Sequence, residues 1–396
     1  MNRAGPIYLD WAATAPLDRR VADAMCACLA DPAAQANPSS GHASGRAAAA
    51  LVARARGEVA ALIGAPAESI VFTSGATESV NLAILGTARA SPREHRHVVC
   101  SRVEHRAVTG ACRQLEREVF EVSWLSPAAG GAIEPAAVAA ALRPDTALVT
   151  LMQVNNETGA LTDIAAVAKL CRERSVPLHV DAAQSAGKLP IDVAVDDGIA
   201  LLSFCAHKLG GPKGIGALYQ RRQPRPALQP LMSGGSHEAG LRPGTLATPQ
   251  IVGFGAACRI ARESLATEPA RIRALRERLW QALQPAAPLW RNGVAEPSAP
   301  GILNAGFAGV EGESLLLALD GEVDVASGAA CHSAVAEPSD VLRALGRSDL
   351  AIQASLRFSL GSGTTEAEVD RAAGLVVAAV RRLRSVLPAG ALERVA

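Results

Sequence analysis

Residues 69–78 read Ser-Ile-Val-Phe-Thr-Ser-Gly-Ala-Thr-Glu, and this stretch joins a short apolar run to the start of a helix-like segment. The β-branched and aromatic residues favour a strand, and the glycine after them favours a turn that leads into a helix. Glycine before a helix N-terminus exposes backbone N–H groups that can bind an anion such as phosphate. The alternative is an ordinary helix cap, made by Ser74 or Thr77.

The same alternation of apolar runs and helix-like stretches continues to Tyr219, and a long helix-like stretch from Ala43 to Ile63 precedes it. This pattern predicts an α/β fold with a mainly parallel seven-stranded sheet, whose ligands collect at the carboxyl ends of the strands. The predicted strands are Ser69–Thr73, His97–Ser101, Glu121–Trp124, Ala147–Leu151, Leu178–Asp181, Ile199–Phe204 and Gly216–Tyr219. The predicted helices between them are Glu78–Ala88, Ala107–Glu118, Glu134–Leu142 and Asp163–Arg174.

The second half of the chain predicts a smaller α+β domain. One long helical stretch is predicted from Thr248 to Leu283, and the Pro/Ala/Gly-rich passage from Pro285 to Gly301 indicates a boundary. Strand-like and helix-like segments then follow: Ile302–Phe307, Glu313–Leu319, Leu356–Ser359 and Thr365–Leu383. We therefore expect a large domain over 18–260, and a smaller one made of 1–17 and 261–396.

Composition excludes several classes of function. Hydrophobic residues make up 49% of the 396-residue chain, aromatic residues 3%, and the formal net charge is +1, so we expect no nucleic-acid partner. The N-terminus lacks an apolar signal region and no run approaches a membrane span, so we expect a cytoplasmic protein without a membrane partner. The eight cysteines form no Cys-x-x-Cys pair, which predicts neither a metal site nor a disulfide framework.

Lysine is rare in this chain, and Lys208 has an unusual position among the four lysines. It follows the apolar run that ends at Phe204 and stands next to His207. A desolvated lysine amine has a lowered pKa and can hold a carbonyl cofactor as a Schiff base. The alternative is a strand-end lysine that points into water. The other lysines, at positions 169, 188 and 213, are expected to be solvated surface groups.

Three further strand ends carry polar side chains suited to a pyridine cofactor. Asp181 ends an apolar strand, and a protonated pyridine nitrogen would be a suitable cationic partner for it. An amide of the pair at 155 and 156 could donate to a phenolate oxygen, and His105 could stack on the ring and exchange protons. A helix cap, an asparagine turn and a structural histidine are the respective alternatives. Together with the phosphate-binding turn and Lys208, these residues predict a site for pyridoxal 5′-phosphate (PLP).

Cys331 lies in a segment rich in small residues, Ala-Ser-Gly-Ala-Ala-Cys-His-Ser at 326–333. We expect a mobile, exposed loop there, over about 324–338. His332 could favour the thiolate, which is the reactive form of cysteine. The alternative is an incidental exposed cysteine.

Taken together, these motifs resemble the cysteine desulfurases, which are PLP enzymes of the class V aminotransferase group with fold type I. The long cysteine loop followed by Glu-Pro-Ser at 337–339 is similar to the branch that serves nitrogen fixation and general iron–sulfur cluster assembly. The motifs that carry the resemblance run along almost the whole chain. They lie at 7–10, 37–40, 72–79, 104–105, 155–159, 181–184, 207–208, 242–245, 327–331, 337–339, 341–346 and 357–360.

The resemblance implies specific roles around the cofactor. Lys208 would form the Schiff base with PLP and later move the Cα proton, Asp181 would pair with the pyridine nitrogen, and His105 would stack on the ring and shuttle protons. Ala76, Thr77 and His207 would hold the phosphate, joined by Thr245 from the second subunit of a homodimer, while Asn156 and Gln184 would bond the phenolate oxygen.

The resemblance also implies the reaction. Arg357 and Asn156 would bind the substrate L-cysteine, with the Arg357 guanidinium clamping its carboxylate. Cys331 would be the nucleophile that takes the sulfur as a persulfide, releases L-alanine and passes the sulfur to an acceptor protein such as an iron–sulfur scaffold.

One cofactor position departs from the family pattern. Cys205 stands where a phosphate-binding serine is usual, and a thiol is a weaker hydrogen-bond donor. Two alternatives to a desulfurase therefore stay open. The first is a selenocysteine lyase or a β-eliminating PLP lyase of the same fold. The second is a catalytically silent paralogue that acts as a scaffold.

Overall fold

The fold is described here from a computed structural model covering residues 5–327, 329–330 and 337–386. A seven-stranded sheet forms its larger part, with strand order β2-β8-β7-β6-β5-β3-β4. Neighbouring strands are parallel except at β8, which runs antiparallel to both β2 and β7. The predicted α/β fold with a mainly parallel seven-stranded sheet is therefore confirmed. Its strands are β2 (Ile70–Thr73), β3 (His97–Ser101), β4 (Glu121–Leu125), β5 (Thr146–Met152), β6 (Leu178–Asp181), β7 (Ile199–Cys205) and β8 (Gly216–Gln220).

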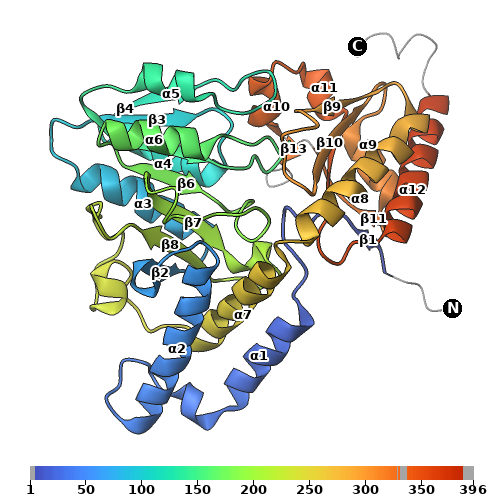
Figure 1. The fold of residues 1–396 in the computed structure, drawn as a ribbon. Helices are drawn as coiled ribbons and strands as arrows, with labels where there is room; N and C mark the ends of the chain where they lie inside the picture. The colour runs from blue at the N-terminus through green and yellow to red at the C-terminus, as the bar shows by residue number, and fades with distance from the viewer. Residues whose placement is uncertain (1–4, 328, 331–336, 387–396) are drawn as a thin grey trace.

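Helices cover this sheet on both sides (Figure 1). The helix α7 packs against α1 and α2 below the sheet, and a Cβ at Gly255 of α7 would lie 2.7 Å from Ala55 Cα of α2. Glycine therefore allows these two helices to approach each other closely. The helices of this part are α1 (Arg19–Ala30), α2 (Ala43–Ala61), α3 (Ala76–Ala90), α4 (Arg106–Arg117), α5 (Pro135–Ala141), α6 (Ile164–Glu173) and α7 (Thr248–Ser264).

A four-stranded sheet of order β12-β15-β10-β9 is the centre of the smaller part, on the right in Figure 1. Its strands are β9 (Leu289–Asn292), β10 (Ile302–Phe307), β12 (Ala326–Ser327) and β15 (Ser355–Ser359). Two short pairs accompany it: β1 (Ile7–Tyr8) with β11 (Val323–Asp324), and β13 (Ala329–Ala330) with β14 (Glu337–Pro338). The helices are α8 (Glu268–Leu283), α9 (Gly312–Leu319), α10 (Asp340–Ala344), α11 (Asp349–Gln353) and α12 (Glu366–Ser385).

Three features differ from what the sequence predicts. The single helix expected over 248–283 is two helices, α7 and α8, because Pro269 at the start of α8 cannot continue a helix from the preceding turn. The passage 285–301, where the sequence indicates a boundary, contains β9 of the smaller sheet. Helices α1, α10 and α11 were not predicted; Asp18 caps α1 by accepting a hydrogen bond from Arg20 N.

Two large buried clusters support the two sheets. One lies around the seven-stranded sheet and contains Phe72, Phe204 and Phe254, and the other lies around the four-stranded sheet and contains Phe307 and Phe358. The domain limits given above stay a prediction. In the part of the chain that the structure describes, no helix has both the length and the apolar character needed to cross a membrane.

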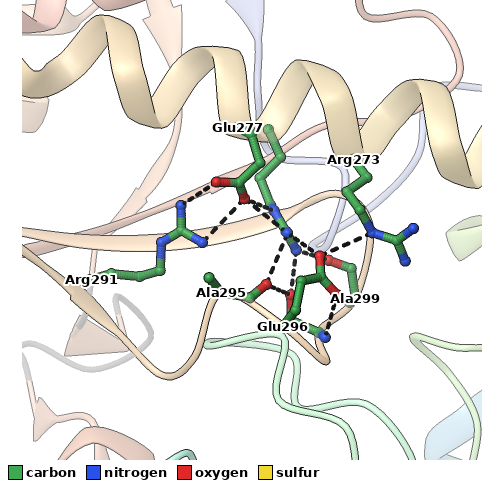
Figure 2. Close-up of polar contacts among 8 residues, drawn as sticks. Arg273, Glu277, Arg291, Ala295, Glu296 and Ala299 are labelled. Carbon is green, nitrogen blue, oxygen red and sulfur yellow. Dashed lines mark hydrogen bonds and ion pairs between the residues drawn. The ribbon is translucent and has the colours of Figure 1, made fainter.

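A polar network joins α8 to the segment 295–299 (Figure 2). Arg276 is only 1% exposed and donates to the carbonyl oxygens of Ala295 and Ala299 and to Ser298 Oγ. Ala299 N in turn donates to Gly159 O at 2.8 Å. This network therefore links the smaller part to the turn that follows β5.

Candidate active site

The carboxyl ends of the parallel strands bring most of the predicted site residues to one edge of the large sheet. Because β2, β3, β5, β6 and β7 run in the same direction, the segments after them meet at that edge. His105 begins α4, Asp181 ends β6, and His207 and Lys208 lie in the 3₁₀ turn directly after β7. The remaining predicted residues at this edge are Ala76 and Thr77 in the first turn of α3, Asn156 after β5, Gln184 after β6 and Cys205 at the end of β7.

The Lys208 amine points inward, toward the N-terminal segment of the chain. Its Nζ donates to Ala12 O and, at 2.7 Å, to Ala13 O. Burial lowers the pKa of Lys208, and the positive charge of Arg357 acts in the same direction. A lysine with a lowered pKa is a better nucleophile and base near neutral pH than a solvated one. Lys208 is thus not a solvated strand-end lysine.

Asp181 and His105 interact electrostatically with each other and with Lys208. Asp181 is 6% exposed; burial raises its pKa, while a hydrogen bond from Ala183 N and the charges of His105 and Lys208 act against that rise. Partial burial lowers the pKa of His105, although the residue as a whole is exposed; the charge of Asp181 acts against this shift. His105 Nδ1 accepts from Ala107 N at 3.1 Å, so the neutral ring carries its proton on Nε2. His105 therefore also serves as the cap of α4.

Gln184 is held by two contacts. Its Nε2 donates to Ala12 O at 2.8 Å, and its Oε1 accepts from Lys188 Nζ at 2.9 Å. Burial, together with the charge of Lys208, lowers the pKa of Lys188 to about 7. The expectation that Lys188 is a solvated surface group is therefore wrong: the turn after β6 directs its amine into the site.

The two asparagines after β5 have different environments. Asn155 is 2% exposed; its Nδ2 donates to Val103 O, and its Oδ1 accepts from the backbone of Glu157 and Thr158. Asn155 therefore shapes the turn and links it to the segment after β3. Asn156 is partly exposed, and its backbone oxygen accepts from Arg357 Nη1 at 3.0 Å.

The turn after β2 forms an open cradle. Gly75 caps α3 without a side chain, and a Cβ built on it would meet no atom within 4 Å. The turn lies directly against β8: a Cβ at Gly216 of that strand would be 2.6 Å from the carbonyl carbon of Gly75. Only a glycine at position 216 therefore allows this contact. Burial alone would raise the pKa of Glu78, but hydrogen bonds from Ser74 and Arg242 lower it.

Cys205 and His207 lie beside this cradle. Cys205 is 1% exposed, and burial raises the pKa of its thiol, so the group is a neutral thiol at neutral pH. The backbone N–H groups of Ala76 and Lys208 oppose that rise in pKa. His207 Nδ1 lies 3.2 Å from Thr14 Oγ1, and burial lowers the pKa of its imidazole to about 4.

Arg357 comes from β15 of the smaller sheet and reaches the same edge. Its Nη2 forms an ion pair with Asp10 Oδ1 at 2.8 Å. Its Nε is buried and has no hydrogen-bond partner among the residues that the structure describes. A guanidinium with an unused donor suits an additional carboxylate ligand.

Two predicted residues are not joined to this cluster. Thr245 is exposed in the segment between β8 and α7, and within the described residues it makes no hydrogen bond to the other site residues. Cys331, with the neighbouring His332, lies outside the residues that the structure describes.

The residues at this edge fit PLP. Three features match three groups of that cofactor. The buried carboxylate at the end of β6 suits the pyridinium, the lysine with lowered pKa after β7 suits the aldehyde, and the open helix N-terminus after β2 suits the phosphate. Asp181 also has no ion-pair partner in the ranges that the structure covers, so a cationic ring nitrogen would complete its environment.

Three residues at or beside the site have no role in the sequence-based prediction: Asp10, Glu104 and Lys188. Glu104 directly precedes His105, is buried, and interacts electrostatically with Asp181. The first two lie inside motifs that carry the family resemblance, but nothing local marks them as parts of a site. Lys188 is four residues after Gln184 in a Gly-Lys-Leu-Pro turn, and that spacing is the only signal that could have found it.

Comparison with known proteins places the chain in a family. Residues 7–372 match the family Aminotransferase class-V. Cysteine desulfurase IscS of Salmonella arizonae is 50% identical over 384 residues, which cover 97% of this chain and 95% of that protein. Cysteine desulfurase IscS of Aeromonas hydrophila is 51% identical, with the same coverage of both chains.

Solved structures agree with this assignment. A NifS-like protein superposes with a TM-score of 0.88 at 30% identity, covering 97% of this chain and all of that one. DndA from Streptomyces lividans superposes with a TM-score of 0.75 at 37% identity, covering 87% of this chain and 97% of that one. The chain belongs to the aminotransferase class-V family and, within it, to the PLP-dependent cysteine desulfurases.

Proposed function

We propose that this chain converts L-cysteine to L-alanine and takes the sulfur onto Cys331 as a persulfide. The observation that carries the proposal is the meeting of Lys208, His105 and Asp181 at one sheet edge with Arg357 from the other sheet. In the overall reaction the substrate C–S bond breaks, an S–S bond forms on Cys331, and the thiol proton balances the new C–H bond of alanine. No external oxidant is required.

Each residue of the site has one task in this reaction. Bound PLP supplies an electron sink for the carbon next to the substrate amine. Arg357 orients the substrate through its carboxylate, and the Lys208 amine, with its lowered pKa, removes the Cα proton. Asp181 keeps a negative charge at the ring nitrogen. His105 Nε2 exchanges protons near the departing sulfur.

The remaining residues hold the cofactor. We assign Ala76, Thr77 and His207 to the phosphate, with the Cys205 thiol as a weak additional donor. Asn156 and Gln184 are assigned to the ring oxygen. Thr245 is assigned to the phosphate of a second subunit, which makes the active form a homodimer.

The sulfur then passes from Cys331 to an acceptor protein, for which we propose an iron–sulfur scaffold. The family assignment and the long segment between β12 and α10 support this proposal. We also propose a cytoplasmic location; seven unpaired cysteines among the described residues fit a reducing compartment.

The test is an absorption spectrum of the purified protein, followed by addition of L-cysteine with assays for alanine and for protein-bound persulfide. We expect equal amounts of alanine and transferred sulfur. Release of free sulfide by a protein lacking the Cys331 thiol would instead indicate a β-eliminating lyase, and strong preference for selenocysteine would indicate a selenocysteine lyase. No cofactor absorbance and no alanine would indicate a scaffold paralogue.

A further inference from the structure

Lys188 is a second lysine of the site, and the reaction described above does not use it. Its Nζ donates to Gln184 Oε1 at 2.9 Å. The charged and titratable groups that act on it are Lys208, Cys205 and Arg357, and burial lowers its pKa to about 7. A buried amine beside other cations is costly to keep, which makes such a group a candidate for function.

The contact between Lys188 and Gln184 fixes the orientation of an amide. Lys188 Nζ donates to Oε1 on one side of the amide, and on the other side the carbonyl of Ala12 can only accept, so the NH₂ group points toward Ala12. There Nε2 donates to Ala12 O at 2.8 Å, and Ala12 O also accepts from Lys208 Nζ. Because an amide nitrogen carries two N–H bonds, one remains for a group bound beside Lys208.

We propose that Lys188 is a positioning residue, which fixes the Gln184 carboxamide so that its second N–H faces the ring oxygen of the cofactor. This rests on the proposed function, from which it takes the role of Gln184. Without Lys188, only the contact with Ala12 O holds the amide, so its second N–H is held less firmly toward the ring oxygen. The turn itself does not need the Lys188 side chain, since Lys188 N donates to Ser185 O at 2.9 Å through the backbone.

The test compares Lys188→Met, Lys188→Arg and the control Lys169→Met, whose lysine is exposed on α6. The measurements are the PLP dissociation constant of the cofactor-free protein and the visible absorbance of the loaded protein, both without cysteine. We expect K188M to weaken PLP binding roughly two- to tenfold, the net effect of one hydrogen bond, and to shift the absorbance maximum. The arginine of K188R can also donate a hydrogen bond to Gln184, so its PLP affinity and absorbance should stay close to those of the native protein. The PLP affinity and absorbance of K169M should equal the native values.

A double-mutant cycle separates positioning from a general structural effect. In a Gln184→Ala background, K188M should have no further effect on PLP affinity or absorbance, because the amide to be oriented is gone. Any of four results would overturn the proposal. K188M could have the PLP affinity and absorbance of the native protein, or K188R and K188M could lose PLP affinity equally. The effects of K188M and Q184A could be fully additive, or cofactor-free K188M could fail to fold. A native protein that binds no PLP would instead reject the proposed function.

Discussion

Arg357 and Asp10 form an ion pair across the site, with Nη2 and Oδ1 2.8 Å apart. Arg357 lies on β15 and Asp10 follows β1, so the pair is formed by residues 347 positions apart in the sequence. Together with the bond from Nη1 to Asn156 O, it fixes the plane of the guanidinium. The buried Nε, which has no partner within the described residues, is left as a donor.

Arg357→Lys should raise KM for L-cysteine about tenfold to a hundredfold, because a charge-assisted hydrogen bond is worth about 1.5–3 kcal/mol and lysine lacks the planar fork. The effect is measured by steady-state alanine production. The absorbance of bound cofactor without cysteine should not change. Asp10→Asn is the companion variant and should raise KM less, since it loosens the guanidinium without removing it. A native KM in R357K would contradict the assignment.

Cys331→Ala should retain cofactor absorbance and its change on addition of cysteine, and lose alanine production. The reason is that the substrate C–S bond breaks only when a thiolate accepts the sulfur. Cys26→Ser, at an exposed cysteine on α1, is the control and should keep full turnover. Undiminished turnover in C331A would remove Cys331 from the reaction.

Cys205→Ser should tighten PLP binding roughly two- to tenfold, because a hydroxyl donates a stronger hydrogen bond than the buried neutral thiol. Equilibrium titration of the cofactor-free protein with PLP measures this change. Cys205→Ala, which removes the donor altogether, should bind PLP no more tightly than the native protein. Equal affinities of the serine and alanine variants would show that the side chain at 205 does not contact the phosphate.

Glu104 makes the stability of the native protein depend on pH. Burial raises its pKa to about 8 from the usual 4.5, although a hydrogen bond from Ser101 opposes the rise. The native state therefore keeps a proton between about pH 4.5 and 8 that the unfolded chain has lost, and stability falls as the pH rises through this window.

Glu104→Gln, which is permanently neutral, should remove this dependence. Its stability relative to the native protein should increase with pH by up to about 1.4 kcal/mol per pH unit, measured by urea unfolding at several pH values. Glu173→Gln, at an exposed position of α6, should show no such trend. A pH-independent difference between E104Q and the native protein would mean that Glu104 is ionised in the fold.

Arg276→Met should lower the free energy of unfolding more than the same substitution at any exposed arginine of α8. The change leaves the buried carbonyl group of Ala299 without its donor, at roughly 1–3 kcal/mol, and also removes the hydrogen bonds to Ser298 Oγ and to Ala295 O, the latter of which still accepts from Ser298 Oγ. Thermal unfolding measures the loss. Arg278→Met is the matched control: this residue lies on the same helix and forms an exposed ion pair with Asp370, which solvent screens. Equal melting temperatures would contradict the importance of this network.

Local sequence was sufficient to predict the seven strands of the large sheet, since each is an apolar run bounded by turn residues. It was insufficient at 265–269, where apolar spacing continues across the break between α7 and α8 and only the proline marks it. Helix α1 escaped prediction although its buried residues, Val21 and Cys28, stand seven positions apart, which is two helical turns.

The sequence by itself was enough to place a lysine, a histidine, an aspartate and a glycine turn at one sheet edge. Each of them follows a predicted parallel strand, and the carboxyl ends of parallel strands lie at the same edge. Which side chains lose contact with water was decided by the tertiary structure alone. Lys208 meets the backbone of Ala12, 196 positions away, and Lys188 turns inward onto Gln184. Burial, and the pKa shifts it causes, depends on chain segments that are distant in sequence, which no local pattern records.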